Sequence, residues 1–226
     1  MPIDPGAELK ITAYNWVPPF AVGLVRDLRV RWAAEEMGLP YRENLISVMA
    51  KPDGYGAQQP FLQVPAIRDG KIAMFESGAI LLHLAERTGK LLPAAGQARA
   101  DVLTWLFAAL NSVEPAQDPI TVIDGFYAQE DWAKARRPAV LKNLNRRYGE
   151  LAAAIGGREW VAGEFSIADI AMVTVLRTCD ALGLLAGHPV LAAYVARATA
   201  RPAYQQALAD QLAGFDDTNA PKRENG

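Results

Sequence analysis

The sequence is poor in the residues that form disulfides and metal sites. Its 226 residues include one cysteine, Cys179, and two histidines. A single cysteine cannot form a disulfide within the chain, which fits a protein of a reducing compartment. With so few cysteine and histidine side chains, we expect no Cys/His metal site and no metal cofactor.

Neither sign of charge dominates, and long apolar runs are missing. Lys+Arg number 23 and Asp+Glu 25, for a net charge of -2. We therefore expect no nucleic acid and no anionic membrane as a partner. No apolar run reaches the roughly 20 residues of a membrane-spanning helix, and the first residues lack the basic start and apolar core of a signal peptide. A cytoplasmic protein is expected, and the 51% of hydrophobic residues suffices for a substantial core.

The most informative stretch covers residues 63–86 and reads QVPAIRDGKIAMFESGAILLHLAE. Short apolar runs separated by turn residues predict two strands, at residues 64–68 and 71–75. Asp69-Gly70 is predicted as the two-residue turn of a hairpin, because glycine accepts the positive φ that such a turn needs. The apolar residues that follow recur at helical spacing and predict a helix.

Two features of this stretch point to a ligand. Pro65 lies at the start of a strand, and we predict a cis bond before it, which leaves the backbone of Val64 free to pair with an extended ligand. The helix is predicted to open at Glu76-Ser77, with Ser77 as its N-cap. Helix N–H groups and a serine hydroxyl suit a carboxylate, and Glu76 suits an ammonium, so an amino acid head fits this pair. The alternative is an ordinary hairpin followed by an ordinary capped helix.

The sequences VPAI at residues 64–67 and ESGAI at residues 76–80 look like the glutathione-binding half of a glutathione transferase. A second match, SIADIA at residues 166–171, resembles the buried capping box of that family's helical domain. The resemblance covers nearly the whole chain. It implies a homodimeric detoxification enzyme that binds glutathione as co-substrate and activates its thiol for attack on a small hydrophobic electrophile. It assigns glutathione binding to Gln63, Val64, Pro65, Glu76 and Ser77.

The order of elements agrees with this resemblance. It predicts an α+β thioredoxin-like domain (βαβαββα) at residues 1–88, a linker at 89–97 and an all-α helical bundle at 98–226. The first elements are expected to be a strand, a helix and a second strand parallel to the first, at 9–16, 24–37 and 41–48. Apolar periodicity predicts the later helices at 98–111 (continuing toward 127, with disturbance at Pro115 and Pro119), 131–155, 166–182, 189–200 and 202–214.

The group that activates the thiol departs from the family's pattern. The resemblance implies a Tyr, Ser or Cys at the end of the first strand or in the first turn of the first helix, and the Ser/Cys position falls on apolar residues 24–25. Tyr14 ends the first strand and is the nearest hydroxyl. Arg26, in the first helical turn, can face the glutathione carboxylate or the sulfur. We expect Tyr14 and Arg26 to be catalytic, with Asn15 and the backbone of the 17–23 loop as alternatives.

Other residues have predicted roles away from the thiol. The electrophile is expected to bind between the domains, against walls that include Trp16, Phe20, Trp105 and Asn111. Ser166 and Asp169 form a capping box whose role is structural, since it opens a very apolar helix. Cys179 lies within that helix and is expected to be a small buried hydrophobe and not a reactive thiol.

Two further functions compete with the transferase reading. A glutathione-dependent peroxidase, isomerase or dehalogenase can use the same fold. A non-catalytic, transferase-like binding or regulatory protein is the third reading, because the Ser/Cys position is apolar and a fold does not fix a function.

Overall fold

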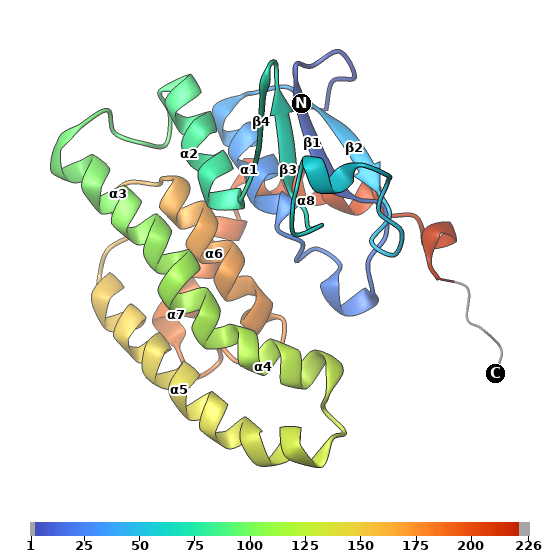
Figure 1. The fold of residues 1–226 in the computed structure, drawn as a ribbon. Coiled ribbons are helices and arrows are strands. Elements are labelled where there is room, and N and C mark those ends of the chain that lie inside the picture. Colours follow the sequence, from blue (N-terminus) through green and yellow to red (C-terminus); the bar gives the residue numbers. More distant parts are fainter. Residues whose placement is uncertain (1–2, 222–226) are drawn as a thin grey trace. The chain divides into compact units, whose positions relative to one another are not determined.

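A computed structural model describes residues 3–221 of the chain. These residues divide into two compact units (Figure 1), which we call the sheet unit (residues 3–88 and 201–221) and the helical unit (residues 89–200). The sheet unit contains β1 (Leu9–Tyr14), α1 (Asp27–Met37), β2 (Tyr41–Ile46), β3 (Ala66–Asp69), β4 (Ile72–Phe75), α2 (Ser77–Thr88) and α8 (Pro202–Ala213). The helical unit contains α3 (Gly96–Ala108), a π-helical turn (Ala109–Val113), α4 (Glu114–Phe126), α5 (Asp131–Ile155), α6 (Ile167–Asp180) and α7 (Pro189–Thr199).

The sheet unit is built on four strands in the order β2-β1-β3-β4. β1 and β2 are parallel, with Leu9 opposite Tyr41, and β3 runs antiparallel to both β1 and β4. α1 makes the crossover between the parallel strands and ends at Gly38, whose φ of 70° is the left-handed cap that glycine favours. The mixed sheet and its helices confirm the predicted thioredoxin-like architecture.

The hairpin between β3 and β4 turns one residue later than predicted. Asp69 still pairs with Ile72, so the two turn residues are Gly70 and Lys71. Gly70 has a φ of 58° at the first turn position, as a type II′ turn requires. The prediction of a two-residue turn holding this glycine is right, and the assignment of Asp69 to the turn is wrong.

The last helix, α8, packs in the sheet unit. The ring centroids of Trp32 on α1 and Tyr204 on α8 lie 5.0 Å apart in an edge-to-face arrangement. Arg201, just before α8, donates two hydrogen bonds of 2.6 and 2.8 Å to the carboxylate of Glu36 on α1. The sequence places residues 202–214 in the helical bundle, because helical periodicity predicts a helix but does not identify the surface that it covers.

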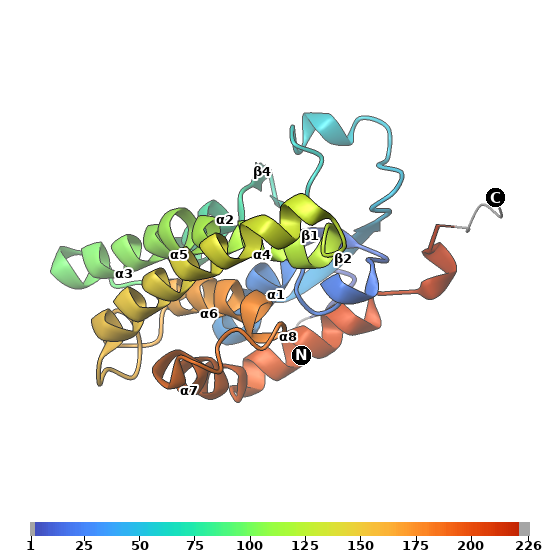
Figure 2. The same ribbon diagram turned by 90° about the horizontal axis from the view of Figure 1, so that it is seen from below.

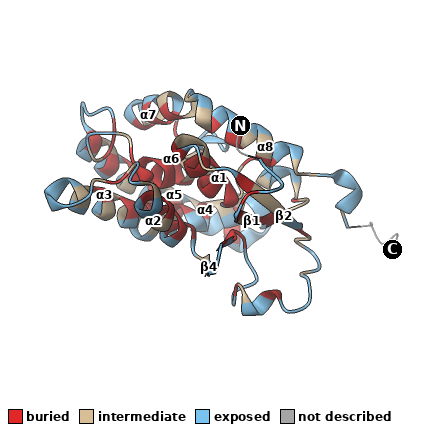
Figure 3. Ribbon diagram, turned by 90° about the horizontal axis from the view of Figure 1, so that it is seen from above, coloured by how far each residue is buried: buried red, intermediate tan, exposed pale blue. Residues whose placement is uncertain are grey.

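α6 is the central helix of the helical unit and is buried along most of its length (Figure 3). α3 continues through the π-helical turn into α4, as the long rod of Figure 2 shows. The π-helical turn at Ala109–Val113 interrupts the α-helix just before Pro115, which lies in the first turn of α4. Pro119 lies inside α4, and the α-helix continues through it, so no disturbance is seen at this second proline. α5 begins and ends where the sequence predicts and stops at Gly156.

Two structural predictions in the helical unit are confirmed. Ser166 is the N-cap of α6 and forms the predicted capping box with Asp169. Cys179 is completely buried, and burial raises the pKa of its thiol to about 11. The thiol is therefore protonated at neutral pH and enclosed by the protein. Within residues 3–221, no helix has both the length and the apolar character needed to cross a membrane.

Candidate functional site

Tyr14 and the loop that carries Val64 lie together in the sheet unit. Tyr14 and Val25 pack against three buried residues, Ile46, Tyr55 and Val64. We call these five residues the Val64 cluster. It joins the end of β1, the segment before α1, the end of β2 and the loop before β3. Two residues predicted from separate arguments, Tyr14 for thiol activation and Val64 for ligand pairing, therefore belong to one packed cluster.

The Val64–Pro65 peptide bond is cis, as predicted. Val64 lies just outside β3, and its backbone takes part in none of the loop and turn hydrogen bonds between backbone groups of residues 3–221. The hydroxyl of Tyr55 donates a 2.6 Å hydrogen bond to the carbonyl of Gln63, which ties the loop to the short helix at Tyr55–Ala57. Burial, and the nearby Tyr14, raise the pKa of Tyr55 to about 12, so this donor keeps its proton at neutral pH.

Glu76 and Ser77 stand at the N-terminus of α2, but not in the predicted roles. α2 begins at Ser77, and the carbonyl of Glu76 accepts the first helical hydrogen bond, from the Ile80 N–H at 2.9 Å. Ser77 is therefore the first helical residue and not the N-cap. Glu76 has a φ of 70°, a backbone conformation that residues other than glycine rarely adopt and that costs energy. Glu76 is exposed, and the neighbouring Ser77 is buried.

Arg29 on α1 supports Ser77 from within the protein. Its NH1 donates a 3.1 Å hydrogen bond to the Ser77 hydroxyl oxygen, and both residues are buried. Sequence reasoning did not find this contact, because the two residues lie 48 positions apart. A buried arginine is unusual, since burying a charge is costly without a partner. The arginine itself is the only signal of this contact that the sequence carries.

Tyr14 is half-buried and has two charged neighbours. The Lys51 ammonium lies 4.5 Å from the centroid of the Tyr14 ring and donates hydrogen bonds of 3.2 and 2.6 Å to the carbonyls of Ser47 and Val48. Burial, and then the charge of Asp27, raise the pKa of Tyr14 above its ordinary value. Burial lowers the pKa of Lys51. Tyr14 is therefore a neutral hydroxyl donor near pH 7, and Lys51 is a neighbouring cation that the sequence did not point to.

Arg26 is exposed immediately before α1, which begins at Asp27 and not at residue 24 as predicted. The adjacent backbone is held by the last helix: Gln211 Nε2 donates to the Val25 carbonyl at 3.1 Å and to Asp27 Oδ1 at 2.9 Å. Asp27 Oδ2 accepts a 2.7 Å hydrogen bond from Arg31 Nε. The carboxylate of Asp27 thus fixes the start of α1 through side chains and does not cap it.

The four predicted wall residues fall in different units. Trp16 and Phe20 belong to the sheet unit, and Phe20 is about half exposed. Trp105 on α3 and Asn111 in the π-helical turn belong to the helical unit, where the Arg158 guanidinium lies 5.8 Å from the Trp105 ring centroid. The electrophile site that these residues were expected to share stays a prediction.

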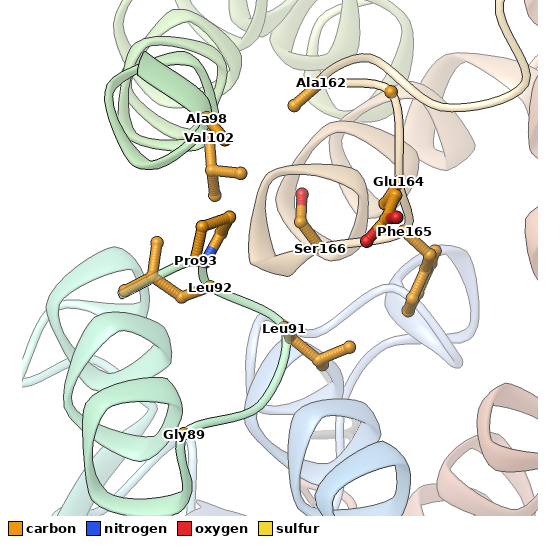
Figure 4. Close-up of a pocket in the computed structure, with 11 residues that line it drawn as sticks. Gly89, Leu91, Leu92, Pro93, Ala98, Val102, Ala162, Glu164, Phe165 and Ser166 are labelled. Carbon is orange, nitrogen blue, oxygen red and sulfur yellow. The ribbon is translucent and has the colours of Figure 1, made fainter. Parts of the chain in front are cut away.

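The helical unit has a cavity of its own, of about 550 Å³ (Figure 4). It lies between the segment after α2, the start of α3 and the loop before α6. Leu92, Val102 and Phe165 supply apolar walls, while Glu164 and Ser166 supply oxygen atoms. None of the predicted glutathione-binding or catalytic residues is among the described residues that line it. This cavity is therefore not where the sequence places the chemistry.

Comparison with known proteins gives matches over both parts of the chain. Residues 28–87 match the family model "Glutathione S-transferase, N-terminal domain", and residues 103–202 match "Glutathione S-transferase, C-terminal domain". The chain is 32% identical over 158 residues to the disulfide-bond oxidoreductase YfcG of Escherichia coli, covering 66% of this chain and 73% of that protein. It is 27% identical over 219 residues to glutathione S-transferase P of Pongo abelii, covering 93% and 99% of the two chains.

A solved structure resembles most of the chain. A glutathione transferase family member from Pseudomonas fluorescens Pf-5, crystallised with two glutathione molecules bound, superposes with a TM-score of 0.78 at 26% identity. The match covers 88% of this chain and 92% of that one.

Proposed function

Because this chain belongs to the glutathione transferase family, we propose that it binds glutathione and activates its thiol for attack on a small hydrophobic electrophile. The observation that supports the proposal is the Val64 cluster, in which Tyr14, whose hydroxyl keeps its proton at neutral pH, packs in the same group of residues as Val64 of the loop predicted to bind the cysteinyl part of glutathione. Glutathione bound to the related Pseudomonas fluorescens protein supports the choice of ligand.

The glutathione-binding residues have separate roles in this proposal. Gln63, Val64 and Pro65 form the loop along which the cysteinyl backbone lies, and the N–H and C=O of Val64 pair with it. Glu76 receives the γ-glutamyl ammonium. Ser77 and the N-terminus of α2 receive the γ-glutamyl carboxylate, because helix N–H groups favour an anion.

Catalysis in this proposal consists of stabilising the thiolate. A free thiol has a pKa of about 8.5, and lowering it by two units takes about 2.7 kcal/mol. A hydroxyl or a cation aimed at the sulfur supplies part of this, and Tyr14 and Arg26 are the groups we assign to it. The thiolate then forms a carbon–sulfur bond to the electrophile. With an aryl halide as the electrophile, the carbon–halogen bond breaks and halide leaves.

Retention on immobilised glutathione, followed by an assay with an activated aryl halide, tests the proposal. We expect retention, elution by free glutathione, and formation of the thioether above the uncatalysed rate. A protein that is retained but forms no thioether with any of several electrophiles is a binding protein instead. A folded protein that is not retained and does not bind glutathione in solution contradicts the proposal.

Thiol–disulfide exchange is a second candidate, favoured by the 32% identity to the E. coli disulfide-bond oxidoreductase. The only cysteine of this chain is completely buried, so the exchanging thiols have to come from glutathione itself. Turnover of a small mixed disulfide by glutathione, measured beside the aryl halide assay, separates the two reactions. Exchange that is much faster than thioether formation favours the oxidoreductase.

Alanine substitution at α2 tests the γ-glutamyl assignment. We expect Glu76→Ala and Ser77→Ala each to weaken glutathione binding by roughly tenfold, because each removes a charged or charge-assisted contact. The unfolding midpoint should change little for Glu76→Ala, since that side chain is exposed. Calorimetric titration measures the affinity, and unchanged affinity in both variants removes the assignment.

A homodimer is the assembly we propose. Phe61 is 66% exposed, and its ring packs edge-to-face on Phe75 of the edge strand β4, with centroids 6.1 Å apart. Ile72 on the same strand is also exposed. Large apolar side chains on an open sheet edge are typical of an interface. Sedimentation equilibrium should give twice the chain mass of 24.5 kDa, and a monomer at assay concentration contradicts this.

A further inference from the structure

Arg29 is a buried charge that lies directly behind a proposed ligand contact. It comes from α1, where it is 2% exposed, and its NH1 group donates to the Ser77 hydroxyl oxygen at 3.1 Å. Ser77 is 6% exposed and opens α2, which packs against α1. The guanidinium is thus on the protein side of the hydroxyl, and the N-terminus of α2 is beside it.

This hydrogen bond determines what the serine can offer to a ligand. A hydroxyl has one hydrogen to donate and two lone pairs to accept with, whereas a guanidinium only donates and is always charged. Because the Arg29 N–H occupies a lone pair of Ser77, the hydroxyl hydrogen is left to point elsewhere. A hydroxyl that accepts from a cation is also polarised into a stronger donor. Ser77 is therefore set to donate to an anionic acceptor.

We propose that Arg29 is a positioning residue for carboxylate recognition, acting through the hydroxyl of Ser77. The inference rests on the proposed function, in which Ser77 meets the γ-glutamyl carboxylate. Arg29 orients the Ser77 hydroxyl as a donor and adds a positive charge behind it. Glu76, exposed at the neighbouring position, places a negative charge where the ammonium belongs. The two charges fix which end of the amino acid head faces which residue.

Two probes separate this role from general support of the fold. The first is glutathione, and the second is its analogue with a γ-aminobutyryl group in place of γ-glutamyl, which lacks the α-carboxylate. We expect Arg29→Gln to weaken glutathione binding roughly tenfold, the size of a lost charge-assisted hydrogen bond, and to change binding of the analogue by less than about twofold. Arg29→Lys keeps the charge but not the planar guanidinium, so its affinity for glutathione should lie between those of the wild type and Arg29→Gln.

A double-variant cycle tests whether Arg29 acts through Ser77. In a Ser77→Ala background, Arg29→Gln should weaken glutathione binding further by much less than tenfold, because the hydroxyl that it orients is gone. Arg31→Gln is the matched control. Arg31 is also a buried arginine of α1, but it pairs with Asp27 and Glu43, so its loss should leave the ratio of the two affinities unchanged.

The outcomes are distinct. If the Arg29 variants weaken the binding of both probes equally, or if the effects of Arg29→Gln and Ser77→Ala on glutathione binding are additive, Arg29 only supports the fold. The inference then fails, while the proposed function stands. If Arg29→Gln does not fold, Arg29→Lys carries the same comparison. If the folded wild-type protein binds neither probe, the proposed function fails and takes this inference with it.

Discussion

Asp169→Ala should lower the free energy of unfolding of the helical unit by about 3–5 kcal/mol, the range for removing one partner of a buried charged network. Asp169 is completely buried. Its Oδ1 accepts from the Val161 N–H at 3.0 Å and from the Tyr194 hydroxyl at 2.8 Å. Its Oδ2 accepts from the N–H and the hydroxyl of Ser166, at 2.9 and 3.0 Å. Alanine leaves these buried donors without an acceptor, and each such group costs about 1–3 kcal/mol.

The size of this effect comes from contacts beyond the capping box. Of the bonds that the Asp169 carboxylate accepts, the box accounts only for the one from the Ser166 N–H, and loss of a cap costs about 0.5–2 kcal/mol. The bonds to Val161 and Tyr194 tie the start of α6 to the preceding loop and to α7. Asp169 therefore holds three segments of the helical unit together.

Two milder substitutions calibrate the measurement. Ser166→Ala removes the hydroxyl alone and should cost about 1 kcal/mol. Asp169→Asn keeps the Oδ1 acceptor but turns an N–H toward the Ser166 donors. Its loss of unfolding free energy should therefore lie between those of Ser166→Ala and Asp169→Ala. Urea unfolding followed by helical circular dichroism gives the series. If Asp169→Ala unfolds at the wild-type midpoint and loses only turnover, the structural assignment is wrong.

The sequence predicts best the features whose cause is local. The sequence predicts both ends of the 131–155 helix and the Ser166–Asp169 capping box, because caps and terminal glycines act within a few residues. The cis bond before Pro65 and the parallel pairing of the first two strands were also predicted correctly. In each case the physical signal lies in the segment that it shapes.

The sequence does not reveal features that depend on distant partners. Periodicity predicted the helix of residues 202–214, but the side chains that bring it onto α1, Tyr204 and Gln211, have no local signature of a partner. The Ser77 hydroxyl was expected to cap its own helix, but it accepts from Arg29, which is 48 positions away. At Glu76 the backbone adopts a φ of 70°, against the ordinary preference of glutamate, and α2 begins at Ser77, one residue earlier than an N-cap at Ser77 predicts.

Tyr14→Phe should slow turnover at pH 7 by about tenfold to a hundredfold while glutathione affinity stays near normal. The substitution removes only the hydroxyl that we assign to stabilising the thiolate, and losing one preorganised donor is costly to catalysis. The pKa of the bound thiol should therefore rise by about one to two units, which is the equivalent change in thiolate population. Because the thiol pKa rises, the loss of turnover should be largest at and below neutral pH, and activity should recover as the pH passes the raised thiol pKa.

The thiolate absorbance of bound glutathione, followed against pH, measures this pKa directly. Tyr14 does not obscure the titration, because burial and Asp27 raise the pKa of its own hydroxyl above the ordinary value. Tyr55→Phe is the matched control. It removes a phenol hydroxyl from the same Val64 cluster, but that hydroxyl donates to the Gln63 carbonyl, so the thiol titration should not move.

Arg26→Ala distinguishes a hydroxyl mechanism from a charge mechanism. A guanidinium lowers the thiol pKa by Coulomb attraction, helped by the N-terminus of α1, and it can also hold a glutathione carboxylate. If Arg26 acts on the sulfur, Arg26→Ala raises the thiol pKa and weakens affinity together, whereas Tyr14→Phe raises the pKa alone. If neither variant moves the titration, the activating group is elsewhere and the catalytic assignment fails. Lys51→Met is then the next variant, because the Lys51 ammonium lies over the Tyr14 ring, 4.5 Å from its centroid, and the substitution removes that charge.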